Sequence, residues 1–210
     1  MSNWPETMTW DEIDTVVFDV GNVLLAWDPP VLAAKIFPED KQKQQIAVER
    51  VYRSPFWPEI DLGKKSIEEI QQEMIGEDSE IAPIVHEAVF SWVKNLPEIS
   101  EGIAALKACK AHGKKTCVLS NFGAEFFAEE ASAHPFFDLF DDMVISGREK
   151  ICKPDAEIYH LVEKKMDSAP ERTLFLDDTL RNVEAAVALG WKGLHVADRH
   201  RLETFFGENV

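Results

Sequence analysis

The feature that most constrains this fold is an alternation of short apolar segments with longer amphipathic ones. From residue 97 onward, four runs rich in β-branched and aromatic residues each follow a segment with helical periodicity. A fifth run of this kind, residues 14–20, lies near the N-terminus. Strands that alternate with helices predict an α/β protein, in which a Rossmann-like parallel sheet carries helices on both faces. The other predicted strands are residues 116–120, 142–146, 173–177 and 193–197.

Residues 29–96 interrupt this alternation. They contain helical patterns broken by Pro and Gly, and no convincing strand. We therefore expect an α/β core formed by residues 1–28 and 97–210, with residues 29–96 inserted as a small helical cap. A chain of 210 residues is long enough for one core with such an insertion. Phe56 and Trp57 are expected in the apolar interior of the cap.

The charge of the chain restricts its partners. The formal net charge is -16 at pH 7, and phosphate backbones demand basic patches, so we expect no nucleic-acid partner. No apolar run is long enough to span a bilayer, and the N-terminal residues lack the basic and apolar regions of a secretory leader. We therefore expect a cytoplasmic protein with no membrane partner. The three cysteines form no C-x-x-C pair and are expected to be reduced. The oligomeric state is left open.

Polar residues stand at the ends of three predicted strands. Asp19 interrupts the apolar run VVFDVGNVLL, Ser120 ends CVLS, and Asp177 and Asp178 follow LFL. Lys153 lies in the loop after the third predicted strand. In parallel α/β sheets the carboxyl ends of the strands meet at one edge, where ligands bind. We therefore expect three acids, a hydroxyl and an ammonium group to converge there.

This set of side chains predicts phosphate chemistry. Carboxylates held together repel one another unless a hard cation neutralises them, and oxygen ligands suit Mg²⁺. A phosphate would then be bound by the Ser120 hydroxyl, the Asn121 backbone N–H and Lys153. Asp19 is the natural nucleophile, and its attack on phosphorus would give an aspartyl-phosphate that water hydrolyses. The pattern predicts a Mg²⁺-dependent phosphomonoesterase that acts on a small sugar phosphate or a related metabolite.

Each of these residues taken alone also has a structural interpretation. Asp19 is a candidate turn or cap residue, although the GNVLL that follows it is typical of an extended run. Ser120 and Asn121 are equally well placed to begin the next helix, and Asp178 to cap the helix that follows it. Lys153 alone is an ordinary loop lysine. The coincidence at several strand ends favours a site over these alternatives.

Four segments resemble, in order and spacing, the motifs of the haloacid dehalogenase-like hydrolases: FDVGNVLL, VLSN, CKPDAEIY and FLDDTLRNVEAA. The resemblance covers residues 12–28 and 97–205, and the insertion is similar to that family's small helical cap. It implies that Asp19 is the nucleophile, that Ser120 binds phosphate and that Lys153 stabilises charge. It further implies that Asp178 binds Mg²⁺ directly, with Asp177 as its auxiliary partner.

Gly21 departs from the pattern of the family. Most of its phosphatases carry a second aspartate two residues after the nucleophile, where it protonates the leaving alcohol. Gly21 retains the backbone carbonyl that the family uses for the metal there, but it has no carboxyl group. General acid catalysis contributes about 10²- to 10⁴-fold, so the loss of this donor matters.

Three accounts of this departure stay open. The substrate has a good leaving group, such as the anomeric oxygen of a sugar phosphate; the DxGNV first motif is similar to that of α-glucose-1-phosphate phosphatases. Asp28 substitutes as the donor, or alternatively caps a helix that begins at Pro29 and Pro30. Or the protein is a catalytically weak protein that binds a phosphorylated ligand. A 2-haloacid dehalogenase is the alternative enzyme, but that chemistry needs no metal, and the acidic pair at 177–178 disfavours it.

Overall fold

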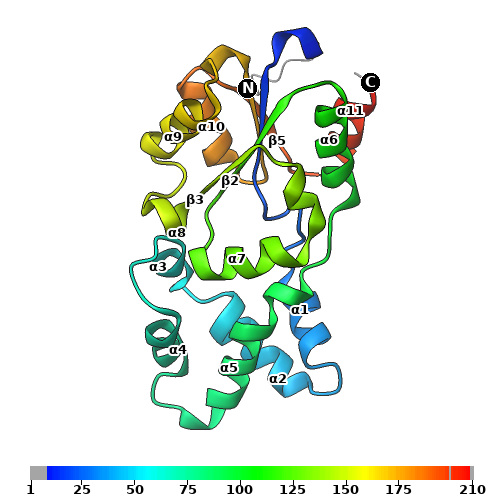
Figure 1. The fold of residues 1–210 in the computed structure, drawn as a ribbon. Helices are drawn as coiled ribbons and strands as arrows, with labels where there is room; N and C mark the ends of the chain where they lie inside the picture. The colour runs from blue at the N-terminus through cyan, green and yellow to red at the C-terminus, as the bar shows by residue number, and fades with distance from the viewer. Residues whose placement is uncertain (1–8, 199, 209–210) are drawn as a thin grey trace.

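The computed structural model describes residues 9–198 and 200–208. A five-stranded parallel sheet, in the order β3-β2-β1-β4-β5, lies at its centre with helices on both faces (Figure 1). The α/β class predicted from the sequence is confirmed, and all five predicted strands are present. They are β1 (Thr15–Phe18), β2 (Lys115–Ser120), β3 (Asp142–Ile145), β4 (Thr173–Asp177) and β5 (Lys192–His195).

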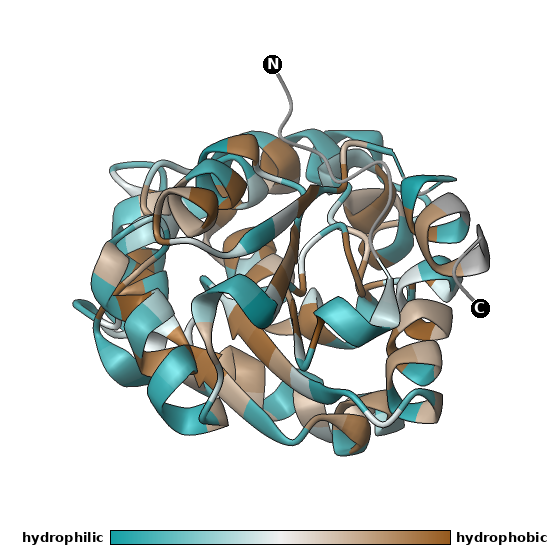
Figure 2. Cartoon of the chain, turned by 90° about the horizontal axis from the view of Figure 1, so that it is seen from above, coloured by the Kyte–Doolittle hydropathy of each residue, from teal (hydrophilic) through white to brown (hydrophobic). Residues whose placement is uncertain are grey.

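The strands are apolar on both sides because both faces of the sheet are covered. Val16 and Phe18 of β1 pack into one apolar cluster, and Val17 between them packs into the other. Seen from above, the strands at the centre are mostly hydrophobic and the surrounding helices are hydrophilic on their outer sides (Figure 2). The first face is covered by α6 (Ser100–Ala111) and α11 (His200–Glu208), and the second by α9 (Ala156–Met166) and α10 (Leu180–Ala188).

The chain between β1 and β2 forms a helical body below the sheet (Figure 1). The two segments that lead into and out of it run side by side, since the Ala26 N–H donates to the Pro97 carbonyl at 2.8 Å. We keep the names core and cap for the two parts that the sequence predicts, and their boundaries stay a prediction. The cap contains α1 (Pro29–Ile36), α2 (Lys41–Ile46), η2 (Ala47–Tyr52), α3 (Trp57–Asp61), α4 (Ile67–Ile75), η3 (Ser79–Ile81), α5 (Ala82–Ser91) and η4 (Val93–Asn95).

The run GNVLL after the first strand is not extended, and this expectation was wrong. The N–H groups of Leu24 and Leu25 both donate to the Val20 carbonyl, so the chain turns back tightly here. Asn22 adopts a positive φ of 54° inside this turn. The turn brings the start of the cap next to the end of β1. The remaining elements are η1 (Trp10–Glu12), α7 (Ala124–Ala133), η5 (Pro135–Leu139), α8 (Ser146–Glu149) and η6 (Pro170–Arg172).

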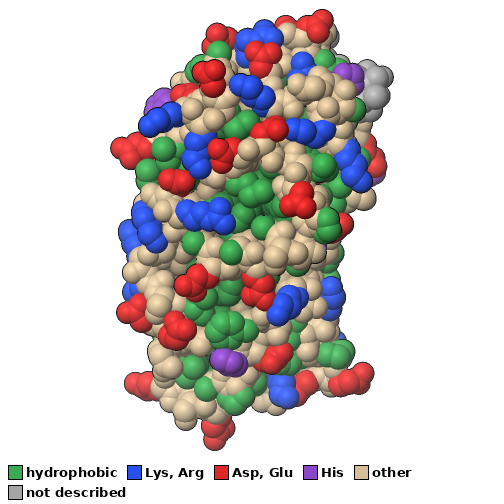
Figure 3. All heavy atoms as spheres, in the orientation of Figure 1, with side chains coloured by type: hydrophobic (Ala, Val, Ile, Leu, Met, Phe, Trp, Pro, Cys, Tyr) green, Lys and Arg blue, Asp and Glu red, His purple; other side chains and the backbone are tan. Residues whose placement is uncertain are grey.

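The surface carries both signs of charge despite the acidic composition. On the face drawn in Figure 3, acidic and basic side chains are interspersed over core and cap. None of the helices within residues 9–198 and 200–208 is both long and apolar enough to cross a membrane. All three cysteines are free thiols. Burial raises the pKa of Cys109 and of Cys117 to about 12, which keeps both thiols protonated.

Candidate active site

Three neighbouring strands deliver the polar residues to one place. β1 lies between β2 and β4, and Phe18 at its end pairs with Val118 on one side and with Leu176 on the other. The next residue, Asp19, therefore stands beside the ends of both neighbours, and its N–H donates to the Leu176 carbonyl at 2.9 Å. The chain proceeds from β1 to β2 and β3 on one side and places β4 and β5 on the other. Asp19 thus lies at the point where the strand order reverses, which is where open α/β sheets bind ligands.

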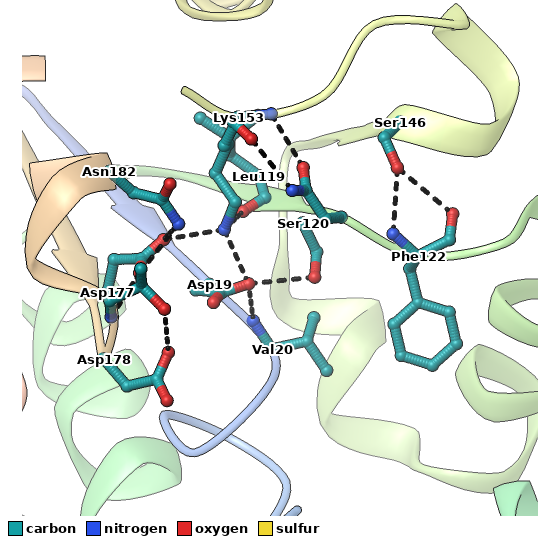
Figure 4. A network of polar contacts seen from close by, with 12 residues as sticks. Asp19, Val20, Leu119, Ser120, Phe122, Ser146, Lys153, Asp177, Asp178 and Asn182 are labelled. Atoms are coloured by element: carbon teal, nitrogen blue, oxygen red, sulfur yellow. Dashed lines mark hydrogen bonds and ion pairs between the residues drawn. The ribbon is translucent and has the colours of Figure 1, made fainter. Parts of the chain in front are cut away.

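One carboxylate oxygen of Asp19 is fixed by three donors (Figure 4). Its Oδ1 accepts from the Val20 N–H at 2.7 Å and from the Ser120 hydroxyl at 2.9 Å, and it lies 2.9 Å from Lys153 Nζ. No donor contacts Oδ2 within the part of the chain that the structure describes. The network therefore orients the carboxylate and leaves its second oxygen available to a ligand.

Lys153 is the cation of the site and is only 3% exposed. Its Nζ lies between Asp19 and Asp177, and it donates to Asp177 Oδ2 at 2.7 Å and to the Leu119 carbonyl at 2.9 Å (Figure 4). Burial lowers the pKa of Lys153, but the two carboxylates outweigh this and raise it above its usual value. Asn121 holds the lysine's backbone, because its Oδ1 accepts the Lys153 N–H at 2.8 Å and its Nδ2 donates to the carbonyl at 3.0 Å.

The two acids at the end of β4 have different surroundings. Asp177 is completely buried, and besides the lysine it accepts the Thr179 N–H at 2.7 Å and the Asn182 amide at 3.1 and 3.2 Å. Asp178 is half-buried, and its Oδ2 accepts the Asn22 amide at 2.9 Å. Asp177 therefore acts inside the protein network, whereas Asp178 is more open to a ligand.

The three carboxylates fit a divalent cation. One oxygen from each of Asp19, Asp177 and Asp178 lies within 4.8 Å of the others. An all-oxygen donor set of this kind suits a hard cation such as Mg²⁺. Burial raises the pKa of Asp19, Lys153 opposes this rise and the charge of Asp177 adds to it. A bound cation would favour the ionised form that a nucleophile requires.

A cavity of about 300 Å³ opens over Asp19 toward the cap. We call the polar cluster at its base the rim. Asp19, Ser120 and Lys153 of the rim line the cavity, and Asp177 and Asp178 adjoin them. The other side of the cavity, which we call the wall, is formed by six aromatic residues: Trp27, Tyr52, Trp57, Trp92, Phe122 and Phe126. The rings pack edge to face, with 5.3 Å between the ring centres of Trp27 and Trp92 and 5.7 Å between those of Trp57 and Trp92.

Two polar side chains of the wall are hydrogen bonded inside the cap. The Tyr52 hydroxyl donates to the Ala88 carbonyl at 3.1 Å, and the Trp57 Nε1–H donates to the Val51 carbonyl at 2.7 Å. Trp57 was expected in the interior of the cap, and it packs there while also lining the cavity. The Trp92 Nε1–H is buried without a partner among the described residues, and the wall otherwise presents mainly ring faces and edges.

Comparison with known proteins identifies the family. A model of the haloacid dehalogenase-like hydrolases matches residues 13–190. The chain belongs to this family of hydrolases. A sesquiterpene phosphatase of Aspergillus oryzae is 30% identical over 87% of this chain and 89% of its own length. A phosphorylated carbohydrates phosphatase of Thermotoga maritima is 26% identical over 85% of this chain and 82% of its own. An enzyme of the family from Bacteroides thetaiotaomicron, solved with magnesium and inorganic phosphate, shares the fold with a TM-score of 0.65 and 21% identity over 87% of this chain and 93% of its own.

The structure of this hydrolase brings most residues of the predicted site together. Asp19, Gly21, Ser120, Asn121 and Lys153 all line the cavity, and Asp177 and Asp178 adjoin it through their network. The comparisons do not test the roles assigned to these residues, so the roles stay predictions.

Asp28 lies elsewhere. It is exposed, it caps α1 and its carboxylate accepts the Val31 N–H at 3.2 Å. It is not among the described residues that line the cavity. The capping interpretation is therefore the one that the structure supports, and we do not retain Asp28 as a substitute acid.

Three further polar residues of this hydrolase were not found from the sequence. Asn182 follows Asp177 by five residues in the first turn of α10, a spacing that points a side chain back at the strand end and could have revealed it. Asn22 and Asp61 gave no such indication. Asp61 ends α3 in the cap and lines the cavity. Burial raises the pKa of Asp61 to about 7, and the negative charge of Asp19 adds to the rise.

Proposed function

We propose that this hydrolase is a Mg²⁺-dependent phosphomonoesterase in which Asp19 attacks phosphorus. The observation that carries this proposal is the arrangement of Asp19, with one oxygen held by three donors and the other available at the base of a cavity. Two relatives are named as phosphatases, and a related structure holds magnesium and phosphate. These findings support phosphate transfer over a purely binding role.

Different residues would bind the phosphate, attack phosphorus and bind the metal. The Ser120 hydroxyl and the Asn121 N–H bind the phosphate oxygens, and Lys153 supplies positive charge from below. Asp19 attacks in line, the alcohol leaves, and water hydrolyses the aspartyl-phosphate to release inorganic phosphate. Asp178, Asp19 and the Gly21 carbonyl would hold Mg²⁺, and Asp177 would be their auxiliary partner. The bound ion would neutralise charge on the phosphate.

The wall supports an apolar organic group on the phosphate. Six aromatic rings face the cavity, and the polar atoms of Tyr52 and Trp57 are already used inside the cap. A hydrocarbon would gain from burial against these rings, whereas the hydroxyls of a sugar would find few partners on the wall itself. The sesquiterpene phosphatase relative agrees with this choice. The small sugar phosphate that the sequence favoured is the second candidate, which the carbohydrate phosphatase relative supports.

Phosphate release from 4-nitrophenyl phosphate, with Mg²⁺ and with EDTA, tests the chemistry. We expect turnover only with the metal, and a loss of at least about 10³-fold in Asp19→Asn. Asp28→Asn is the matched control, because Asp28 is an exposed carboxylate outside the cavity, and it should keep full activity. Full activity in Asp19→Asn would overturn the mechanism.

A comparison of three esters tests which organic group the enzyme prefers. We expect a higher kcat/KM for farnesyl phosphate than for glucose 1-phosphate or glucose 6-phosphate. A preference for either glucose ester would instead select the second candidate and leave the phosphatase chemistry intact.

A further inference from the structure

The cavity has an open space where the family's usual proton donor would stand. Gly21 lies two residues after Asp19 and lines the cavity. A Cβ atom built on Gly21 would have no described atom within 4 Å, so no other side chain fills this space. The leaving alcohol needs a proton when it is a poor leaving group, and the wall supports such an alkyl group. The donor must therefore come from another part of the cavity.

Asp61 is the one carboxyl group besides Asp19 among the described residues that line the cavity. It comes from the cap, at the last position of α3, and so faces the rim from the side on which the organic group enters. Within the described chain it forms no hydrogen bond or ion pair with Asp19, Asp177 or Asp178. Its carboxyl group is thus not used by the network of the rim.

The core holds the backbone around Asp61 in place. The Ser146 hydroxyl donates to the Asp61 carbonyl at 2.5 Å, and Lys150 Nζ donates to the Gly63 carbonyl at 3.0 Å. The Gly123 N–H, from the loop after β2, hydrogen bonds to the Asp61 carboxylate. Gly63 has a φ of +58°, which lets the chain turn away directly after this anchor. Asp61 is therefore presented to the cavity on a fixed segment.

The surroundings of Asp61 favour its protonated form. Burial raises its pKa to about 7, and the charge of Asp19 acts in the same direction. Lys153 and the Gly123 N–H oppose this rise. The Cys152 thiol also lies near it, and Arg181 lines the same cavity. A group with this pKa can both give up and take back a proton at neutral pH.

We propose that Asp61 is the general acid and base of this phosphatase, supplied by the cap in place of a carboxyl group at position 21. The proposal rests on the proposed function. As Asp19 Oδ2 bonds to phosphorus, the bond from phosphorus to the ester oxygen breaks, and that oxygen takes the Asp61 proton and leaves as the alcohol. Water then attacks phosphorus and returns a proton to the Asp61 carboxylate, while the bond to Asp19 breaks and inorganic phosphate leaves.

Two esters with one aromatic ring each separate this role from a structural one. The leaving group of 4-nitrophenyl phosphate departs without protonation, whereas the far more basic oxygen of benzyl phosphate needs an acid. In Asp61→Asn we expect kcat/KM for benzyl phosphate to fall about 10²- to 10⁴-fold and that for 4-nitrophenyl phosphate to change little. The basic limb of the pH profile for benzyl phosphate should disappear as well. Asp28→Asn, which changes an exposed carboxylate outside the cavity, should change kcat/KM for neither ester.

A second variant restores a donor. Because the space at Gly21 is open and its φ is not positive, Gly21→Asp fits there, and the double variant Gly21→Asp with Asp61→Asn should recover benzyl phosphate hydrolysis. If the ratio of kcat/KM for the two esters in Asp61→Asn equals that in the wild type, whether both values are unchanged or fall equally, the role of Asp61 is overturned. Turnover by the wild type would still support the phosphatase function. A wild type that releases phosphate from neither ester overturns the proposed function, and this role with it.

Discussion

The rim and the wall meet at one cavity but are built in opposite ways. Every carboxylate of the rim has partners, and Lys153 binds two of them at 2.7 and 2.9 Å. The wall offers a ligand mainly aromatic rings, since Tyr52 and Trp57 donate into the cap itself. Most of the rim comes from the ends of β1, β2 and β4. Half of the wall comes from the cap (Tyr52, Trp57 and Trp92) and half from the core (Trp27, Phe122 and Phe126). We infer that the rim determines the reaction and the wall determines the organic group.

If this division holds, a change in the rim should abolish chemistry with every ester. Lys153→Met leaves Asp19 and Asp177 buried side by side without their cation. We expect a loss of activity of about 10²- to 10³-fold or more, because the charge below the phosphate is gone. Removing one partner of a buried ion pair costs about 3–5 kcal/mol of stability. Phosphate release and urea unfolding measure the two effects.

Lys164→Met is the control for this change. Lys164 is an exposed lysine of α9, so its loss should leave both turnover and the unfolding midpoint unchanged. Equal behaviour of the two lysine variants would contradict the central place of Lys153 in the rim.

We expect Mg²⁺ binding to depend on residues of the rim and not on residues of the wall. A cation that binds only the folded protein adds about 2.7 kcal/mol of stability at 100 times its dissociation constant. We therefore expect Mg²⁺ to raise the melting temperature of the wild type, and EDTA to reverse the rise. Asp178→Asn should lose the shift, whereas a variant of the wall such as Trp57→Ala should keep it. A shift that survives in Asp178→Asn would contradict the assignment of this residue as a metal ligand.

A change in the wall should affect one class of ester only. Trp57→Ala removes a ring that lines the cavity, so kcat/KM for farnesyl phosphate should fall about 10- to 200-fold, as for other losses of apolar contact. Acetyl phosphate has almost no apolar group and should react as in the wild type. Phe90→Ala, an exposed aromatic residue of the cap at 39% exposure, is the matched control. Equal losses of kcat/KM for both esters in Trp57→Ala would contradict separate roles for the rim and the wall.

The same division explains what the sequence predicted. Asp19, Ser120 and Asp177 each end a strand whose apolar pattern is local, and parallel strands bring their carboxyl ends to one edge. The order of the strands was not needed for that conclusion. The fold class and most of the rim therefore follow from short stretches of sequence.

The wall could not be predicted in this way. Trp57 and Phe126 approach one another only because the cap packs on α7, with 6.1 Å between their ring centres. A tryptophan in the interior of the cap and a tryptophan that faces a ligand have the same local sequence pattern. Asp61 was missed for the same reason, since nothing near it in the sequence connects α3 with the rim. Contacts between separate parts of the chain decide these roles.

The helix behind the wall contains a buried acid without the partners that the rim provides. Glu130 of α7 is completely buried, and neither of its oxygens accepts a hydrogen bond from a described residue, although His134 Nε2 lies 2.9 Å from Oε1. Burial raises the pKa of Glu130 from 4.5 to about 8, and Glu129 adds to the rise. The folded protein therefore holds a proton that the unfolded chain releases above pH 4.5, so stability falls as the pH rises from about 4.5 to 8.

Glu130→Gln removes this titration while keeping the shape of the side chain. Its melting temperature should exceed that of the wild type by a few degrees at pH 8, and the difference should shrink toward pH 5, where Glu130 is protonated in the folded state. Activity on every ester should stay within twofold of the wild type, because Glu130 belongs to neither the rim nor the wall and does not line the cavity. Melting curves of both proteins, recorded at each pH unit, give the change of melting temperature with pH. If the melting temperatures of the two proteins changed equally with pH, Glu130 would be ionised in the folded protein and would have a partner as effective as those of the rim.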